Sequence, residues 1–290
     1  MAAAATLVLS GCTSAASTTA AGPPDRSHDE VQVEVDPAIA ALVPSDISAN
    51  GTLIVGTSPP NQFHGPDGEL VGFDVDVMTA AARLMGLEAQ FRPTSFDSLL
   101  PAVEDEALHT AASSITVNDE RLETVDFVSY FEAGIQWTAA AGTTIEPAEA
   151  CGLRVAVKRG TLSDLREVPA RSEACVEAGR PAIETIRYDS QDDATAAAAL
   201  GTVDAMSADS PVAAYAVNES RGKLRLAGDV VAADPYGWPV RRGSDLTEAL
   251  EAAAVTLVET GVLEEIAGKW GVEGGLIDDP RAWRGDPDTD

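Results

Sequence analysis

The chain has 290 residues, of which 45% are apolar and 23% charged, so it is long enough to build two packed domains. It carries 19 Lys and Arg against 47 Asp and Glu, a net charge of −28. A surface this acidic repels nucleic acid, so we expect no nucleic-acid partner. No stretch reaches the roughly 18 to 20 apolar residues of a membrane-spanning helix, so we expect no membrane-spanning helix.

The N-terminus has the pattern of a secretion signal over residues 1–11. Residues 1–9 are almost wholly Ala, Leu and Val, and Leu9-Ser10-Gly11-Cys12 follows them. This tetrapeptide resembles a bacterial lipobox, which implies cleavage before Cys12 and lipidation of its sulfur, and so an anchor on the outer face of the cell membrane. No Lys or Arg precedes the apolar run, so we expect the true start of translation to lie upstream. The alternative is a disordered Ala-rich tail with a chance cysteine.

The segment from residue 12 to residue 50 is predicted to be a flexible tether. It is rich in Ser, Thr, Ala, Pro and Asp and offers little apolar surface to bury.

From Gly51 onward, strand-like and helix-like patterns alternate. The first series predicts strands at 52–56, 89–92 and 111–115, helices at 72–87 and 96–103, and extended segments at 125–128 and 136–140. After a break, the second series predicts strands at 154–157, 183–187 and 204–207 and helices at 163–178, 191–200 and 210–218. Two such series predict two α/β lobes, each with a mainly parallel sheet. Two helices over 245–259 and 261–270 and a loose tail over 274–290 complete the prediction.

Two cysteines remain after Cys12, and neither belongs to a Cys-x-x-Cys pair. The three histidines are scattered, so there is no zinc motif and we expect no metal and no cofactor. In an exported protein, two leftover cysteines pair more often than they stay free, which predicts a disulfide between Cys151 and Cys175. Asp74 and Asp76 do not have the spacing of a calcium loop and are interpreted as acidic residues in the first turn of a helix.

Nine segments, in order, resemble the bacterial extracellular solute-binding proteins of family 3, the polar amino acid family. The resemblance covers about residues 51–271 and lies in LIVGT (53–57), LVGFDVDV (70–77), SFDSLLPA (95–102), SSITVNDER (113–121), VDF with YF (125–127, 130–131), VAVKRGT (155–161), VDAMSADSP (203–211), DPYG (234–237) and GVLEEIAGKW (261–270).

The resemblance implies a type II periplasmic binding protein-like fold with a ligand cleft between two lobes. Lobe 1 is expected from 51–139 and 233–273 and lobe 2 from 141–231, with a two-stranded hinge near 137–141 and 227–235. Ligand bound in the cleft contacts both lobes and thereby favours the closed form.

A free α-amino acid presents a carboxylate and an ammonium on one carbon, so its site must offer both signs of charge. Arg121 is the candidate for the carboxylate, because a guanidinium matches it with two hydrogen bonds. The resemblance implies that Ser114 and Thr116 join Arg121 and that Ser113 offers a carbonyl to the ammonium. The alternative for Arg121 is an exposed helix residue paired with a neighbouring Glu.

Asp209 follows a strand and is implied as the partner of the ammonium, although it could instead, or in addition, cap the next helix. Phe96 is expected to form an apolar wall or to belong to the core. Thr161 is implied to grip the carboxylate through backbone and hydroxyl, and Lys158 occupies a family position that can touch ligand. Tyr236 is expected to pack near the hinge.

The loop after the first strand departs from the family pattern, because Ser58 stands where many members carry an acidic residue. This loop shapes the side-chain pocket, and Asn61, Gln62 and His64 are candidates for neutral polar contacts in it. Glutamine-like, acidic and basic amino acids all remain open as ligands, with a neutral polar one favoured.

The function predicted from these residues is capture of an α-amino acid by a monomeric lipoprotein and its delivery to an ABC transporter permease, without catalysis. One alternative is a sensory lipoprotein that reports its ligand to a receptor. Another is a dehydratase-like enzyme on the same fold, although the sequence has no Ser-His-Asp, Cys-His or metal constellation.

Overall fold

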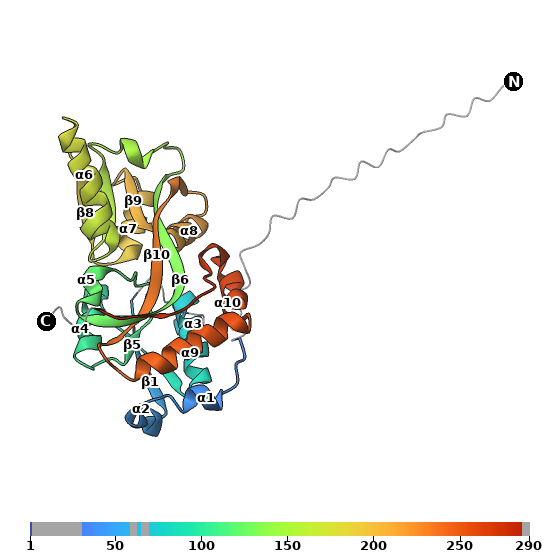
Figure 1. Ribbon diagram of the computed structural model, residues 1–290. Helices are drawn as coiled ribbons and strands as arrows, with labels where there is room; N and C mark the ends of the chain where they lie inside the picture. Colours follow the sequence, from blue (N-terminus) through green and yellow to red (C-terminus); the bar gives the residue numbers. More distant parts are fainter. Residues whose placement is uncertain (2–30, 59–62, 65–69, 286–290) are drawn as a thin grey trace.

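Figure 1 shows the computed structural model, which describes residues 1, 31–58, 63–64 and 70–285. The chain forms two α/β lobes connected by two long strands, β6 (Val125–Ala140) and β10 (Leu224–Arg241), which run through both. The predicted fold class is therefore confirmed.

The first lobe is built on a parallel sheet with the strand order β4-β1-β5. Strand β1 (Thr52–Thr57) buries Leu53 and Val55 completely, and α3 (Phe73–Leu84) packs Val77 into the same core, as its helical spacing predicts. The other elements are α1 (Pro37–Ala40), α2 (Ser45–Asn50), β2 (Phe63–His64), β3 (Leu70–Val71), β4 (Glu88–Pro93), a 3-10 turn (Phe96–Ser98), α4 (Leu99–Glu104), β5 (Thr110–Ala111), α5 (Asp119–Leu122), α9 (Leu246–Glu259), α10 (Val262–Trp270) and a second 3-10 turn (Glu273–Gly275).

The second lobe is built on the strand order β10-β6-β9-β7-β8. Strand β7 (Arg154–Lys158) pairs in parallel with β8 (Glu184–Tyr188) and β9 (Ala205–Asp209), whereas β9 is antiparallel to β6. Around this sheet lie a 3-10 turn (Pro147–Glu149), a π-helical turn (Ser163–Glu167), α6 (Val168–Glu177), α7 (Gln191–Ala199) and α8 (Ser210–Glu219). The carboxyl ends of parallel strands share one edge of a sheet, so Lys158 and Asp209 end at the same edge.

The chain crosses between the lobes where the pairing of β6 with β10 becomes irregular. The register shifts between Ala227 and Val231, again between Val231 and Asp234, and once more next to Tyr236. The expected position of the hinge on β6, near 137–141, is wrong, because residues 137–139 pair with β9 inside the sheet of lobe 2. Both strands continue through the crossing and only their pairing changes, so strand-like patterns alone do not locate it.

The predicted tether is also too long. Within it, residues 37–40 form α1 and residues 45–50 form α2, and Ile39, Val43 and Ile47 pack into the core of lobe 1. Asp36 caps α1 by accepting a hydrogen bond from the backbone N–H of Ala38 at 2.8 Å. The average composition concealed these three apolar residues, which lie in α1, in the connection after it and in α2.

The prediction of a loose C-terminal tail is wrong for residues 274–285. Strand β11 (Ala282–Trp283) adds to β6 in an antiparallel pair, and the Ser129 N–H donates to the Arg281 carbonyl at 2.9 Å. This segment is polar, but its backbone extends the central sheet, which composition alone does not reveal.

The predicted disulfide between Cys151 and Cys175 is confirmed, with a Cα–Cα distance of 5.5 Å. It connects the loop before β7 to α6, at the end of lobe 2 away from the carboxyl ends of the strands. Cys12 lies outside the described residues. Across the described part of the chain, no helix is long and apolar enough to cross a membrane.

Candidate functional site

A small cavity lies where the two lobes meet. Its volume is about 20 Å³, which is room for about one water molecule, so the lobes lie close together. Eight of the residues predicted to contact ligand line it, though Ser58 does not, together with four residues that were not predicted. The predicted ones are Phe96, Ser113, Ser114, Thr116, Arg121, Lys158, Thr161 and Asp209, and the others are Leu162, Gln191, Ala208 and Val212.

Arg121 enters the cavity from lobe 1. It lies on the short helix α5, which Asn118 caps by accepting a hydrogen bond from the Arg121 N–H. Its Nη1 donates to the Thr116 carbonyl at 2.6 Å, and its guanidinium lies 5.7 Å from the centre of the Phe96 ring. Burial lowers the pKa of Arg121, although the negative charge of Asp209 opposes the shift, and a guanidinium stays charged at neutral pH in any case. The alternative of an exposed arginine is therefore wrong.

Asp209 enters the cavity from lobe 2, at the end of β9. Its side chain makes no capping hydrogen bond to α8 and instead accepts one from the Tyr236 hydroxyl at 2.7 Å. Burial raises the pKa of Asp209, while the hydrogen bond from Tyr236 and the positive charges of Arg121 and Lys158 oppose that rise. The cavity thus holds a carboxylate and a guanidinium on opposite lobes.

Lys158 spans the two lobes. Its Nζ donates to the Ser58 hydroxyl of lobe 1 at 3.0 Å and lies 4.8 Å from the centre of the Phe96 ring. Ser58 therefore takes part through this contact although it does not line the cavity. Burial lowers the pKa of Lys158 to about 8, so the ammonium remains mostly protonated at neutral pH.

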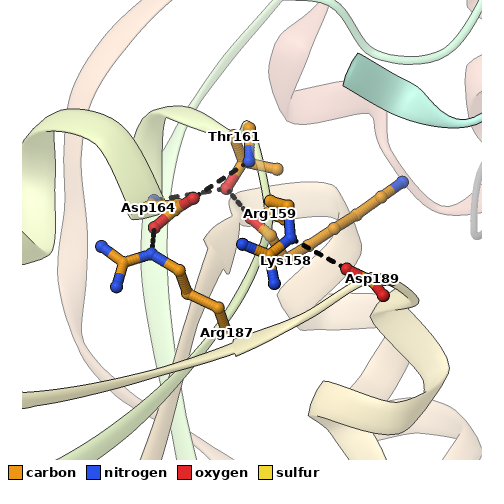
Figure 2. Close-up of polar contacts among 7 residues, drawn as sticks. Lys158, Arg159, Thr161, Asp164, Arg187 and Asp189 are labelled. Carbon is orange, nitrogen blue, oxygen red and sulfur yellow. Dashed lines mark hydrogen bonds and ion pairs between the residues drawn. The ribbon is translucent and has the colours of Figure 1, made fainter. Parts of the chain in front are cut away.

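The loop that follows Lys158 is fixed by its own hydrogen bonds (Figure 2). The Thr161 hydroxyl donates to the Lys158 carbonyl at 2.8 Å, and buried Asp164 accepts from the Gly160 N–H at 3.0 Å. Asp164 also forms an ion pair with Arg187 at 2.6 Å. The Thr161 side chain therefore shapes the loop, and its hydroxyl proton points at backbone rather than into the cavity.

Lys158, the last residue of β7, and Arg159, which follows the strand, have different environments. Figure 2 shows the Lys158 side chain extending away from the Asp164–Arg187 pair, while Arg159 pairs with Asp189 at 2.9 Å. Both members of the Arg159–Asp189 pair are more than half exposed, so this pair contributes little to stability.

Ser113 and Ser114 form part of the lobe 1 wall of the cavity, and their hydroxyl groups have different hydrogen-bond partners. The Ser113 hydroxyl exchanges hydrogen bonds with the backbone N–H and carbonyl of Ser58, each at 3.1 Å, and so fixes the end of β1. Ser114 has a φ of +51°, a backbone conformation that non-glycine residues rarely adopt, and its hydroxyl donates to Asp74 at 2.8 Å. Asp76 faces elsewhere, where it pairs with Lys269 at 2.9 Å.

Three polar residues of the site were not found from the sequence. The Tyr236 hydroxyl donates a hydrogen bond to Asp209, and Asp74 accepts one from the Ser114 hydroxyl. Gln191 is buried at the start of α7, with its Nε2 3.1 Å from the Met206 sulfur. Gln191 follows the β8 strand end, so its place at the ligand edge of the sheet was the one available signal. Asn61 and Gln62 lie outside the described residues, and His64 is described only as part of strand β2.

The comparisons with known proteins match solute-binding and amino acid-binding proteins. Residues 52–273 match the family model described as bacterial extracellular solute-binding proteins, family 3. The arginine-binding protein ArgT of Corynebacterium glutamicum is 38% identical over 263 residues, covering 89% of this chain and 86% of that protein. An ancestral arginine-binding protein bound to arginine has a TM-score of 0.69 at 30% identity, covering 76% of this chain and 98% of that one. An ancestral arginine-binding protein bound to glutamine has a TM-score of 0.68 at 30% identity, covering 77% and 99%.

Proposed function

The chain belongs to the bacterial extracellular solute-binding proteins, family 3, and from that premise we propose that it captures a free α-amino acid between its lobes and delivers it to an ABC transporter permease. The ligand carboxylate pairs with Arg121 and its ammonium with Asp209. A bound amino acid thereby contacts lobe 1 and lobe 2 at once, which stabilises the closed arrangement of the lobes.

One observation carries this proposal: a guanidinium and a carboxylate from different lobes line the same small cavity. Neither group is paired directly with the other by a hydrogen bond among the described residues, since Arg121 donates to the Thr116 carbonyl and Asp209 accepts from Tyr236. An α-amino acid complements both charges without adding net charge, and charge-assisted hydrogen bonds are the stronger ones.

The contacts of Lys158 restrict the side chain of the ligand. Its ammonium lies over Phe96, the ring against which a ligand side chain packs, and Arg121 faces the same ring from lobe 1. A side chain that carries a positive charge would meet like charge there, whereas a side-chain oxygen can accept a hydrogen bond from Lys158. We therefore infer that the ligand has a polar side chain ending in an oxygen acceptor, such as the carboxamide of glutamine, rather than the guanidinium of arginine.

The anchor is the second part of the proposal. Lipidation at Cys12 would hold the protein at the outer face of the membrane, close to a permease. Because the folded part already includes Ile39, the tether available for this is shorter than the whole of 12–50.

A thermal-shift screen of the protein against the common L-amino acids tests the function. A ligand that binds only the folded state raises the melting temperature as its concentration exceeds the dissociation constant. We expect a rise with L-glutamine or L-glutamate that exceeds the rise with L-arginine. A protein that melts at the same temperature with every amino acid at millimolar concentration would contradict the proposal.

A further inference from the structure

One ionisable group near the cleft has no part in the proposed contacts with ligand. Asp74 lies in the first turn of α3 and is 1% exposed. It accepts hydrogen bonds from the Ser114 hydroxyl, from the Ser114 backbone and from the Tyr130 hydroxyl. Both carboxylate oxygens are therefore used as acceptors, which is the state of an ionised carboxyl group.

The residue that Asp74 holds belongs to the cavity wall. Ser114 lines the cavity, and its backbone has a φ of +51°, which is unfavourable for a residue with a side chain. The surrounding contacts must therefore stabilise this conformation. Among the described residues, Asp74 supplies two of these contacts, because it accepts hydrogen bonds from the Ser114 hydroxyl and from the Ser114 backbone.

We propose that Asp74 is a positioning residue of the cleft, whose ionised carboxylate holds Ser114 in its binding conformation, so that protonation of Asp74 weakens the binding of amino acids. This inference rests on the proposed function. A protonated carboxyl group turns one of its two oxygens into a donor, and that oxygen then faces a hydroxyl that already donates. One of the contacts must break or reverse, and Ser114 loses part of its support.

The charges around Asp74 set the pH at which this happens. Burial raises the pKa of Asp74 to about 6, and the negative charge of Asp209 on β9 adds to the rise, while the hydrogen bonds from Tyr130 and Ser114 oppose it. Tyr236 on β10 also lies within electrostatic reach, and Lys269 of α10 pairs with Asp76 instead. Asp74 therefore changes its charge within the range of mildly acidic surroundings.

The sign of the effect on folding is opposite to the sign on binding. The pKa of Asp74 is higher in the folded state than in the unfolded chain, so the folded state binds more protons between pH 3.8 and about 6. Acidification through that range therefore increases the contribution of Asp74 to stability while it decreases affinity. A loss of affinity caused by unfolding would not separate in this way.

The test is calorimetric titration of L-glutamine and L-arginine into the wild-type protein and into Asp74→Asn at pH 7.5 and pH 5. Wild-type affinity for whichever amino acid binds should fall about tenfold at pH 5, because about a tenth of Asp74 is then ionised. The amide of Asp74→Asn has one acceptor oxygen, so this variant should bind about tenfold more weakly at pH 7.5 and lose the part of the pH dependence that Asp74 causes. Asp76→Asn is the matched control, since Asp76 lies in the same helical turn but faces Lys269, and it should follow the wild type.

Tyr130→Phe provides a second variant in case Asp74→Asn does not fold. It keeps the ring that stacks on Trp238 at 4.7 Å but removes a hydrogen bond that lowers the pKa of Asp74. Affinity should then be lost at a higher pH than in the wild type. Wild-type affinity at pH 7.5 in Asp74→Asn, or an unchanged pH profile in either variant, overturns the positioning role while leaving the proposed function intact. Failure of the wild type to bind either amino acid overturns the proposed function and this inference with it.

Discussion

Replacing Lys158 by methionine should change which side chain the cleft prefers. Methionine has a similar length and flexibility but no charge. The Lys158 ammonium lies 4.8 Å from the centre of the Phe96 ring, and a ligand guanidinium packed beside it on the same face of that ring would lie about 5 Å away. At an effective dielectric constant of about 20, two like charges at that distance repel by about 3 kcal/mol, which is roughly 150-fold in affinity.

Calorimetric titration of L-arginine and L-glutamine into Lys158→Met gives the ratio of their dissociation constants, which removes general effects on folding. The ratio should shift toward arginine by up to about 150-fold, and the affinity for glutamine should fall because a hydrogen bond to a charged group is lost. Lys223→Met removes the same charge from an exposed position and should leave the ratio unchanged. A ratio in Lys158→Met within threefold of the wild-type value would refute the assignment of Lys158 to the side-chain pocket.

Two further predictions concern the support of the site and of lobe 2. Tyr236→Phe removes the hydroxyl that donates to Asp209 at 2.7 Å, so L-glutamine affinity should fall by about 1 to 2 kcal/mol in a titration while the melting temperature changes little; equal affinity would mean that Asp209 needs no such partner. The double substitution Cys151→Ser with Cys175→Ser should lower the free energy of unfolding by about 3 kcal/mol in urea, because the disulfide closes a loop of 24 residues. Its affinity should match the wild type, since the disulfide lies at the opposite end of lobe 2 from the cavity, and a large loss of affinity would show that it shapes the cleft.

The sequence patterns anticipated the parts of the fold that depend on local periodicity. The TLIVG run and the apolar face of α3 identified the core of lobe 1 because each pattern extends over a whole element. The position of the hinge on β6 was missed because β6 and β10 both continue through the crossing and only the register of their pairing shifts. The packing of Ile39 was missed for a different reason: three well-spaced apolar residues do not raise the average hydrophobicity of a polar segment.

The residues of the candidate site likewise include some that the sequence predicted and others that it did not. Arg121 and Asp209 were found because each follows a strand within a recognisable motif, and the structure brings them to one cavity. Asp74 and Tyr236 were given structural roles, since their partners Ser114 and Asp209 are far away in the chain and only the folded arrangement joins them. Asp74 does lie in the first turn of a helix, as interpreted from the sequence, and in that position it is also a buried hydrogen-bond acceptor.

The central claim is that Arg121 holds the carboxylate of an amino acid and Asp209 its ammonium. The most direct measurement is a double-mutant cycle by calorimetric titration, in which L-glutamine, its amide without the carboxylate and its 2-oxo analogue without the ammonium are titrated into the wild type, Arg121→Gln and Asp209→Asn. Loss of the carboxylate should cost the wild type about 2 to 5 kcal/mol but Arg121→Gln much less, and loss of the ammonium should show the same pattern with Asp209→Asn. Equal losses in the wild type and the variants would contradict the account, because the ligand groups would then be held by other residues.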